Sequence, residues 1–347
     1  FLVDSVTNIS GSFFWNNDEA RGNEQSVFLN SEIDFIKNLK IGAGLRWSTF
    51  SLAHLNRKFL EPRLHFSYLL GNRLSIHGHY GEFHQNLNRR NLETPFQVDN
   101  GFWYLSDEGI TSDDQWIYIV ENTQRSLGLK YHINNWTFNL EAYSKEIANM
   151  WTAALDFSIQ EDPYTFASMS VKGIEFSTQY RNKKFSLLWT YDYIDENLDL
   201  HWSEEDLKSP FTQPHRISLF QSYQFGKFIA SVHWRYATGR LFSTEPELTT
   251  RRDQNNEEYF VIEHGNILSQ RVPANHSLDV SLLYRFENLF GIPAKGKLGF
   301  HIINLYDRRN IIKNQYYVSY RTNPVSVGLL EKQDLPLTAN FSFHLNF

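Results

Sequence analysis

The chain has 347 residues, no cysteine, a formal net charge of −6 at pH 7, 16% aromatic residues and a mean hydropathy of −0.46. No stretch approaches the roughly 20 consecutive apolar residues of a membrane-spanning helix, and the modest acidity without a basic face argues against a nucleic-acid partner. Many aromatic residues with a polar average favour an all-β protein or a transmembrane β-barrel, in which apolar and polar residues alternate.

Nothing in the sequence divides the chain into domains. No linker, low-complexity tract or change of composition interrupts it, so residues 1–347 are interpreted as one domain. The first residue is Phe1, and no basic segment followed by an apolar segment comes after it. We therefore expect a processed chain or a fragment of a longer one.

Strand-like alternation begins near Gln25. Successive side chains of a strand point to opposite faces of the sheet, so a half-apolar strand shows a period of two. An earlier candidate, Ile9–Trp15, is ambiguous. Short turns at 37–38 and 71–72 suit hairpins, because Asn and Gly tolerate positive φ. The predicted strands of this part are 27–35, 39–47, 64–70 and 74–79.

The second half of the chain alternates more clearly. Short turns are predicted at 134–135, 182–183 and 226–227, and no segment with helical periodicity competes. The predicted strands are 127–133, 136–142, 174–181, 185–193, 217–225, 228–236, 278–286, 298–304 and 335–347. The total is about fourteen strands, of the roughly 9–11 residues that a tilted membrane strand needs.

The last of these strands, Leu335–Phe347, is apolar at every odd position and ends the chain on a phenylalanine. Soluble proteins tend to end in polar, frayed residues. An apolar strand at the very end is typical of the closing strand of an outer-membrane barrel. Such a strand needs a partner on each side, because unpaired backbone groups in hydrocarbon cost several kcal/mol each.

Three regularities favour a membrane barrel over a soluble sandwich. The apolar faces of the predicted strands carry almost no charge, as a lipid-facing surface requires. Aromatic residues gather at strand ends, as in the interfacial girdles of barrels; they are Trp47, Tyr131, Trp136, Tyr193, Trp234 and Tyr236. The short turns alternate with long polar loops at about 86–123, 150–169, 196–212, 240–274 and 307–334. Because short turns are periplasmic in such barrels, we expect a multi-pass outer-membrane protein with a periplasmic C-terminus.

Several segments, in this order and in phase with the predicted strands, resemble TonB-dependent receptors. They are Phe59-Leu60-Glu61-Pro62-Arg63, Tyr80-Gly81-Glu82-Phe83-His84-Gln85, Val171-Lys172-Gly173-Ile174-Glu175-Phe176, Pro214-His215-Arg216-Ile217-Ser218-Leu219, Trp234-Arg235-Tyr236-Ala237-Thr238-Gly239-Arg240, Pro273-Ala274-Asn275-His276-Ser277-Leu278-Asp279-Val280 and Asn304-Leu305-Tyr306-Asp307-Arg308-Arg309-Asn310. The resemblance extends from about residue 25 to the end.

The resemblance implies a transmembrane antiparallel up-and-down β-barrel of about 22 strands with an N-terminal plug inside it. It also implies active uptake of a scarce ligand, such as a siderophore, a cobalamin-like molecule or an oligosaccharide. The energy comes from a TonB-type protein of the inner membrane, and a surface lipoprotein is a further potential partner. We find neither the plug nor the segment that grips the energising protein. The chain therefore resembles the C-terminal two-thirds of such a barrel.

Charged residues on the polar faces of the strands are the candidates to face the lumen, and in a complete receptor to contact the plug. They are Arg46, Arg63, Lys130, Glu141, Glu175, Arg181, Arg235 and Arg285. Aromatic residues in the long loops are the candidates for ligand contact, since exposed rings stack on sugars and aromatic ligands. They are Trp103, Tyr104, Trp116, Tyr118, Trp151 and Trp202.

We expect no metal site, cofactor or catalytic residue. His77 and His79 share one face of a strand, with His65 nearby, but no carboxylate or thiol in the right register completes a metal-binding set. No nucleophile elbow of the G-x-S-x-G type is present. We interpret Gly173 and Pro214 as structural residues at strand ends.

Two other functions remain open at this point. A passive porin-like channel would be a smaller closed barrel and would give a stable conductance by itself. A barrel subunit of an outer-membrane assembly or secretion complex would co-purify with other proteins and bind no small ligand. An upstream coding region for a plug would favour the receptor.

Overall fold

The computed structural model describes most of the chain from Gly22 onward. The described residues are 22–52, 55–92, 100–105, 119–153, 164–200, 207–209, 211–252, 256, 258–263, 265–266, 268–287, 295–319 and 324–346. They form one large antiparallel sheet and four two-stranded sheets. Among these residues, no helix is long and apolar enough to cross a membrane.

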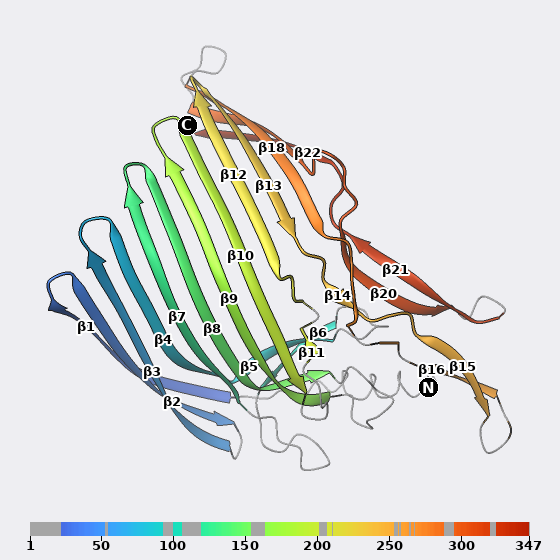
Figure 1. Ribbon diagram of the computed structural model, residues 1–347. Helices are drawn as coiled ribbons and strands as arrows, with labels where there is room; N and C mark the ends of the chain where they lie inside the picture. The colour runs from blue at the N-terminus through green and yellow to red at the C-terminus, as the bar shows by residue number, and fades with distance from the viewer. Residues whose placement is uncertain are drawn as a thin grey trace.

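The large sheet has 14 strands, of which all but the two-residue β11 (Leu207–Lys208) follow one another across the sheet in chain order. In sheet order they are β1 (Gly22–Ile36), β2 (Leu39–Leu52), β3 (Leu55–Leu70), β4 (Leu74–Gln85), β7 (Val120–Ile133), β8 (Trp136–Ala153), β9 (Tyr164–Arg181), β10 (Phe185–Leu200), β12 (His215–Phe225), β13 (Phe228–Ala237), β18 (Asn275–Phe286), β19 (Lys295–Ile303) and β22 (Thr338–Asn346). Figure 1 shows them side by side as a curved, open trough.

Each strand predicted from residue 27 onward corresponds to one of these long strands. The ambiguous candidate Ile9–Trp15 lies outside the described residues, and the remaining strand of the sheet is β11, which pairs with the end of β10. The last strand starts at Thr338 rather than at Leu335. Its predicted first residues are held at the rim instead: the Leu335 carbonyl accepts a hydrogen bond from Asn304, and the Leu337 N–H donates to Asp307.

The predicted turns have the expected backbone geometry. Positive φ occurs at Asn38 (71°), Gly71 (63°), Asn134 (52°) and Gly226 (59°). Asn182 shapes its turn differently, since its side-chain oxygen accepts two backbone N–H groups of the following residues at 2.8 and 2.7 Å. All these turns lie at one end of the sheet, together with the C-terminal end of β22 (Figure 1). We call this the short-turn end, and the opposite end the long-loop end.

The two faces of the sheet differ in polarity. Register keeps apolar residues together across strands, as in the row Leu129, Leu140 and Phe176, and polar residues together on the other face, as in the row Gly128, Glu141 and Glu175. Side chains of the five strands β3, β4, β7, β8 and β9 line a single cavity on the polar face. Side chains converge on the inside of a curve, so the polar face is the concave face and the apolar face the convex one.

Several strands are longer than predicted. β8 and β9 have 18 residues each and β10 has 16, so the predicted lengths and the predicted loops at 150–169 and 196–212 are wrong at their edges. Towards the long-loop end the pattern inverts. On the convex face of β10, Asp195 follows Tyr193 and faces Lys172, whereas Leu198 and Leu200 are buried against Ala167 on the other side.

The inversion explains why alternation alone underestimates these strands. On the short-turn side of the inversion, the convex face is apolar and the concave face is polar, as a strand in lipid requires. On the long-loop side, charged residues lie on the convex face and apolar residues pack on the concave face, as in a strand surrounded by water. The pairing continues through the inversion, because backbone hydrogen bonds do not depend on which face is apolar.

The longer connections at the long-loop end carry small hairpins of their own. They are formed by β5 (Leu87–Leu92) with β6 (Asn100–Leu105), β14 (Leu241–Phe242) with β17 (Gln270–Arg271), β15 (Glu247–Arg252) with β16 (Glu258–Glu263), and β20 (Ile311–Ser319) with β21 (Ser326–Gln333). Within the described residues, β1 pairs only with β2, and β22 pairs only with β19.

Candidate functional site on the concave face

All eight charged residues predicted to face the lumen lie on the concave face. Most of their cross-strand partners are polar or small, for instance Ser277 opposite Arg235 and Ser75 opposite Lys130; Phe28, opposite Arg46, is an exception. They do not form one site, because they are distributed over strands from β2 to β18. The structure instead gathers charge at two places on this face, one near the long-loop end of β2 and β3 and one in the middle of the wall.

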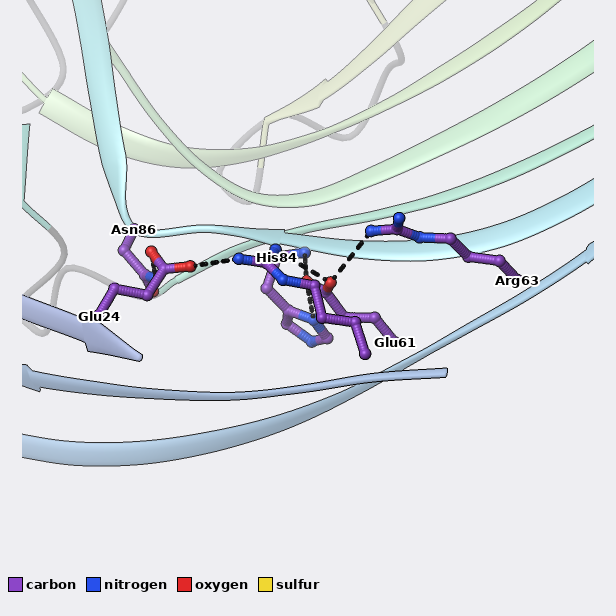
Figure 2. Close-up of polar contacts among 6 residues, drawn as sticks. Glu24, Glu61, Arg63, His84 and Asn86 are labelled. Atoms are coloured by element: carbon purple, nitrogen blue, oxygen red, sulfur yellow. Dashed lines mark hydrogen bonds and ion pairs between the residues drawn. The ribbon is translucent and has the colours of Figure 1, made fainter. Parts of the chain in front are cut away.

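The first gathering surrounds Glu61, whose side chain is only 1% exposed. One carboxylate oxygen accepts hydrogen bonds from Arg46 at 3.2 Å and Arg63 at 3.4 Å, and the other accepts the backbone N–H of His84 at 2.9 Å (Figure 2). A buried carboxylate is stable only when it is paired and hydrogen-bonded. The two arginines and the His84 N–H provide this pairing and these hydrogen bonds.

The position of Glu61 follows from the strand register. Pairing between β3 and β4 stops at Arg63 opposite Gly81, so the two strands separate beyond that point. The Glu61 side chain lies in the gap and accepts a hydrogen bond from the backbone N–H of His84, a residue of β4 that no longer pairs with β3. Glu24 extends the cluster, since its carboxylate accepts from Arg46 at 2.7 Å and from the Asn86 amide at 3.0 Å (Figure 2). The cluster thereby joins β1, β2, β3 and the end of β4.

The second gathering is a row of carboxylates across three strands. Glu141, Glu175 and Asp192 are directly opposite one another in register on β8, β9 and β10. Like charges opposite each other destabilise a sheet, and the row is relieved at its two ends. His77 lies 3.6 Å from Glu141, and Arg216 is opposite Asp192. Glu175, in the middle of the row, has a carboxylate opposite it on each side.

A cavity of about 500 Å³ opens beside this row. Most of its lining residues have polar side chains; they include His65, His77, His79, Glu141, Lys145 and Glu175. His77 lies across Gly128 towards Glu141, and His65 lies across Gly42 towards Glu32 at 3.7 Å. Among the described residues, no three His, Cys, Asp or Glu side chains are placed to hold a metal ion. The arrangement offers hydrogen bonds and charge, and no nucleophile activated by a base.

Hydrogen bonds at the long-loop end join several of the segments that carry the family resemblance. Gln213 donates to the Thr238 carbonyl at 2.9 Å, and Asn310 makes two hydrogen bonds to the backbone of His276. Asn304 is 2% exposed; its amide donates to the carbonyls of Arg308 at 2.9 Å and Leu335 at 3.1 Å. These contacts join the residues before β12 to those after β13, and the connection after β19 to the start of β18 and to the residues before β22.

The predicted ligand-contacting aromatics are only partly described. Trp103 and Tyr104 lie in β6 and Trp151 lies near the end of β8, all at the long-loop end. Trp116, Tyr118 and Trp202 lie outside the described residues. Their role in ligand contact stays a prediction.

Sequence reasoning missed the most buried charge of the concave face, Glu61, together with Glu24 and Asp192. A signal was available for all three. Each occupies a polar-face position in an alternating strand, as Arg46, Arg63 and Glu175 do. What alternation does not indicate is which polar-face residues converge, because that depends on the register between strands.

Comparison with known proteins identifies a family with this architecture. Residues 2–305 match the family described as TonB dependent receptor-like, beta-barrel. No curated protein sequence matches the chain. Similar solved structures include the ferric yersiniabactin uptake receptor FyuA of Yersinia pestis, with a TM-score of 0.61 and 12% identity over 94% of this chain and 46% of that one.

Two further structures are similar. One is the pyoverdine outer membrane receptor FpvA of Pseudomonas aeruginosa PAO1, with a TM-score of 0.59 and 12% identity over 94% of this chain and 42% of that one. The other is the ferric preacinetobactin receptor BauA of Acinetobacter baumannii, with a TM-score of 0.57 and 14% identity over 94% and 43%. The chain spans less than half the length of each of these three proteins. The all-β, antiparallel fold expected from the sequence is confirmed, and the chain belongs to the TonB-dependent receptor-like β-barrel family of outer-membrane receptors and transporters.

Proposed function

We propose that this chain is the barrel portion of a receptor that imports a ferric chelate across the outer membrane with energy from a TonB-type partner. The observation that carries the proposal is the concave wall. It presents hydrogen-bonding and charged side chains along strands whose other face is apolar, and the matching family consists of receptors and transporters. The three similar structures named above are receptors for pyoverdine, ferric yersiniabactin and ferric preacinetobactin, which favours an iron chelate over cobalamin or an oligosaccharide.

The concave wall would contact a plug in the whole receptor. The row of Glu141, Glu175 and Asp192 supplies more negative charge than the neighbouring basic groups offset, so it suits cationic side chains of a plug. Arg46, Arg63, Lys130, Arg181, Arg235 and Arg285 would meet the plug's polar and acidic groups. Further strands of the same barrel would pair with the edges of β1 and β22, because an unpaired edge is unfavourable in a membrane.

The short-turn end would face the periplasm, with the C-terminus, and the long-loop end the outside. Short periplasmic turns and longer outer loops are the rule in such barrels. Ligand capture would then fall to the hairpins β5–β6, β15–β16 and β20–β21 and to the loop aromatics. No residue of this chain is required to perform covalent chemistry.

The test is uptake by whole cells. The complete coding region that contains this chain is expressed in a host that lacks its own ferric-chelate receptors, and uptake of radioactive iron is measured with a panel of siderophores. Uptake that stops when the TonB-type partner is deleted supports the proposal. Uptake that continues without that partner would indicate a passive porin-like channel, and uptake of cobalamin or an oligosaccharide alone would exclude the iron chelate.

A second measurement addresses the assembly alternative. The receptor is purified from its native membrane, and the proteins bound to it are identified by mass spectrometry. A stable stoichiometric complex with other envelope proteins, together with no uptake of any small ligand, would favour an assembly or secretion subunit.

A further inference from the structure

A belt of aromatic side chains crosses the convex face at the short-turn end. Phe185 and Tyr223 are opposite each other in register, and the other neighbours in the belt have ring centroids 4.9 to 6.3 Å apart. From β9 to β18 the belt consists of Tyr180, Phe185, Tyr223, Phe225, Phe228 and Tyr284. Aromatic belts of this kind lie at the boundary between hydrocarbon and head groups. The short turns beyond the belt therefore lie at the level of the head groups.

These turns are basic. Four of the five short turns carry lysine or arginine, and none of the five carries aspartate or glutamate. The cations are Lys37, Arg73, Lys183, Lys184 and Lys227; all are exposed, and none forms an ion pair with another residue that the structure describes. Because the chain as a whole has a net charge of −6, this concentration of positive charge is local to the short-turn end.

Two of these turns flank the belt and are held in place by backbone hydrogen bonds. The Lys184 carbonyl, in the turn between β9 and β10, accepts the Gln224 N–H of β12 at 2.7 Å. The Lys227 carbonyl, in the turn between β12 and β13, accepts the Arg285 N–H of β18 at 2.8 Å. The two turns are separated by two strand spacings, or about 10 Å. The aromatic surface of β10 and β12 lies between them.

We propose that the Lys184 and Lys227 turns bind the phosphate group of an anionic phospholipid between them, with an acyl chain over the exposed rings of Tyr223 and Phe225. The cations border the lipid-facing surface, so a head group reaches them while its acyl chains stay on the apolar face. No carboxylate in these turns competes for the two ammonium groups. This inference is independent of what the receptor imports; only the assignment of the lipid to the inner leaflet rests on the orientation proposed above.

The test uses the complete receptor, purified in a neutral detergent, and native mass spectrometry with phosphatidylglycerol and phosphatidylcholine as the probes. We expect the receptor to retain phosphatidylglycerol more strongly. Lys184→Gln and Lys227→Gln should each weaken its retention about fivefold, the factor that corresponds to about 1 kcal/mol for one cation near anionic head groups. Retention of phosphatidylcholine should not change. Lys184→Arg and Lys227→Arg keep the charge and should keep the retention of phosphatidylglycerol.

The matched control is Lys297→Gln. Lys297 is an exposed lysine at the same end of the sheet, but it lies on the concave face of β19, opposite Arg285. Its replacement should leave retention of both lipids unchanged. An equal loss in this control would overturn the proposal, as would equal retention of the two lipids by the unaltered receptor. Displacement of phosphatidylglycerol by inorganic phosphate would assign the lysines to free phosphate, and a co-purifying acidic protein lost on Lys184→Gln would assign them to that protein; either result would overturn the lipid.

Discussion

Gly239 approaches Val272 so closely that a Cβ atom on Gly239 would lie 1.6 Å from the Val272 carbonyl oxygen. The Val272 N–H donates in turn to the Arg240 carbonyl at 3.0 Å. Arg271, the residue before Val272, donates to the carbonyls of Gly239 at 2.9 Å and Thr212 at 2.8 Å. The two ends of the long connection between β13 and β18 are held together here, backbone against backbone.

Replacing Gly239 should therefore destabilise the long-loop end. Gly239→Ala places a methyl group against a backbone carbonyl, which no rotamer change relieves, and overpacking of this kind costs about 1–3 kcal/mol. The free energy of unfolding is measured with urea in lipid vesicles. Gly71→Asn is the control, because Gly71 has open space around it and a positive φ that asparagine tolerates; a loss of stability there as large as at Gly239 would contradict the explanation.

The buried carboxylate of Glu61 should contribute more to the free energy of unfolding than an exposed carboxylate does. Glu61→Gln removes the charge between Arg46 and Arg63, and we expect a loss of about 1–3 kcal/mol, less than for a fully buried pair because both arginines are partly exposed. Glu32→Gln is the control: its carboxylate pairs with exposed Lys40 at 3.3 Å, and the expected loss is below about 0.5 kcal/mol. Equal effects of the two substitutions on urea unfolding would show that burial of Glu61 is not what matters.

A charged side chain introduced on the convex face should destabilise the fold more than one introduced on the concave face. Leu282→Arg puts a guanidinium on the apolar face of β18, at an expected cost of about 2–4 kcal/mol near the middle of the bilayer. Ser281→Arg, one residue earlier, points to the concave face and should cost far less. Folding into vesicles, followed by the shift in gel mobility on heating, measures both variants. Failure of Ser281→Arg alone would mean that the two faces are exchanged.

The orientation in the membrane can be determined by labelling single introduced cysteines, because the chain itself contains no cysteine. We expect Glu247→Cys, at the start of β15, to react in intact cells with a membrane-impermeant maleimide. Asn72→Cys, in the turn between β3 and β4, should react only after the outer membrane is opened. The reverse pattern would place the short turns, and with them the C-terminus, outside the cell.

Asn304 should hold the β20–β21 hairpin to the rim. Its side chain bridges two carbonyls, its backbone N–H donates to Asp279 at 2.9 Å, and its φ is 53°. Asn304→Ala loses the side-chain bonds and adds strain, so we expect a loss of about 2–4 kcal/mol and faster proteolysis within β20–β21. Asn340→Ala, on β22, is the control and should leave the cleavage rate unchanged; identical rates for both variants would argue against this anchoring role.

Much of the fold was predictable because β-alternation is a local signal. The residues from Val27 to Phe35 and from Leu127 to Ile133 indicate strands without reference to any partner, and Asn38, Gly71 and Gly226 indicate the turns between them. The predicted strand lengths are wrong where the apolar residues switch from one face of the strand to the other. Alternation predicts loops at the outer parts of β8, β9 and β10, because the apolar residues there lie on the face that is polar along the rest of each strand.

The candidate site was less predictable. Alternation correctly assigned Glu141 and Glu175 to one face of their strands, but it says nothing about which residue stands opposite. That Asp192 joins them in a row depends on the stagger of three strands, and that Glu61 is buried depends on where β3 and β4 separate.

The alternation of side chains between two environments can be recognised in the amino-acid sequence, strand after strand, since the side-chain period of two is a property of the extended backbone. Which polar residues meet is set by the pairing of the strands in the folded sheet. Leu200 and Glu61 are both almost fully buried, one in an apolar cluster and one between two arginines. Their neighbours come from the adjacent strands of the sheet, and which residues meet depends on the register between those strands, which alternation within one strand does not contain.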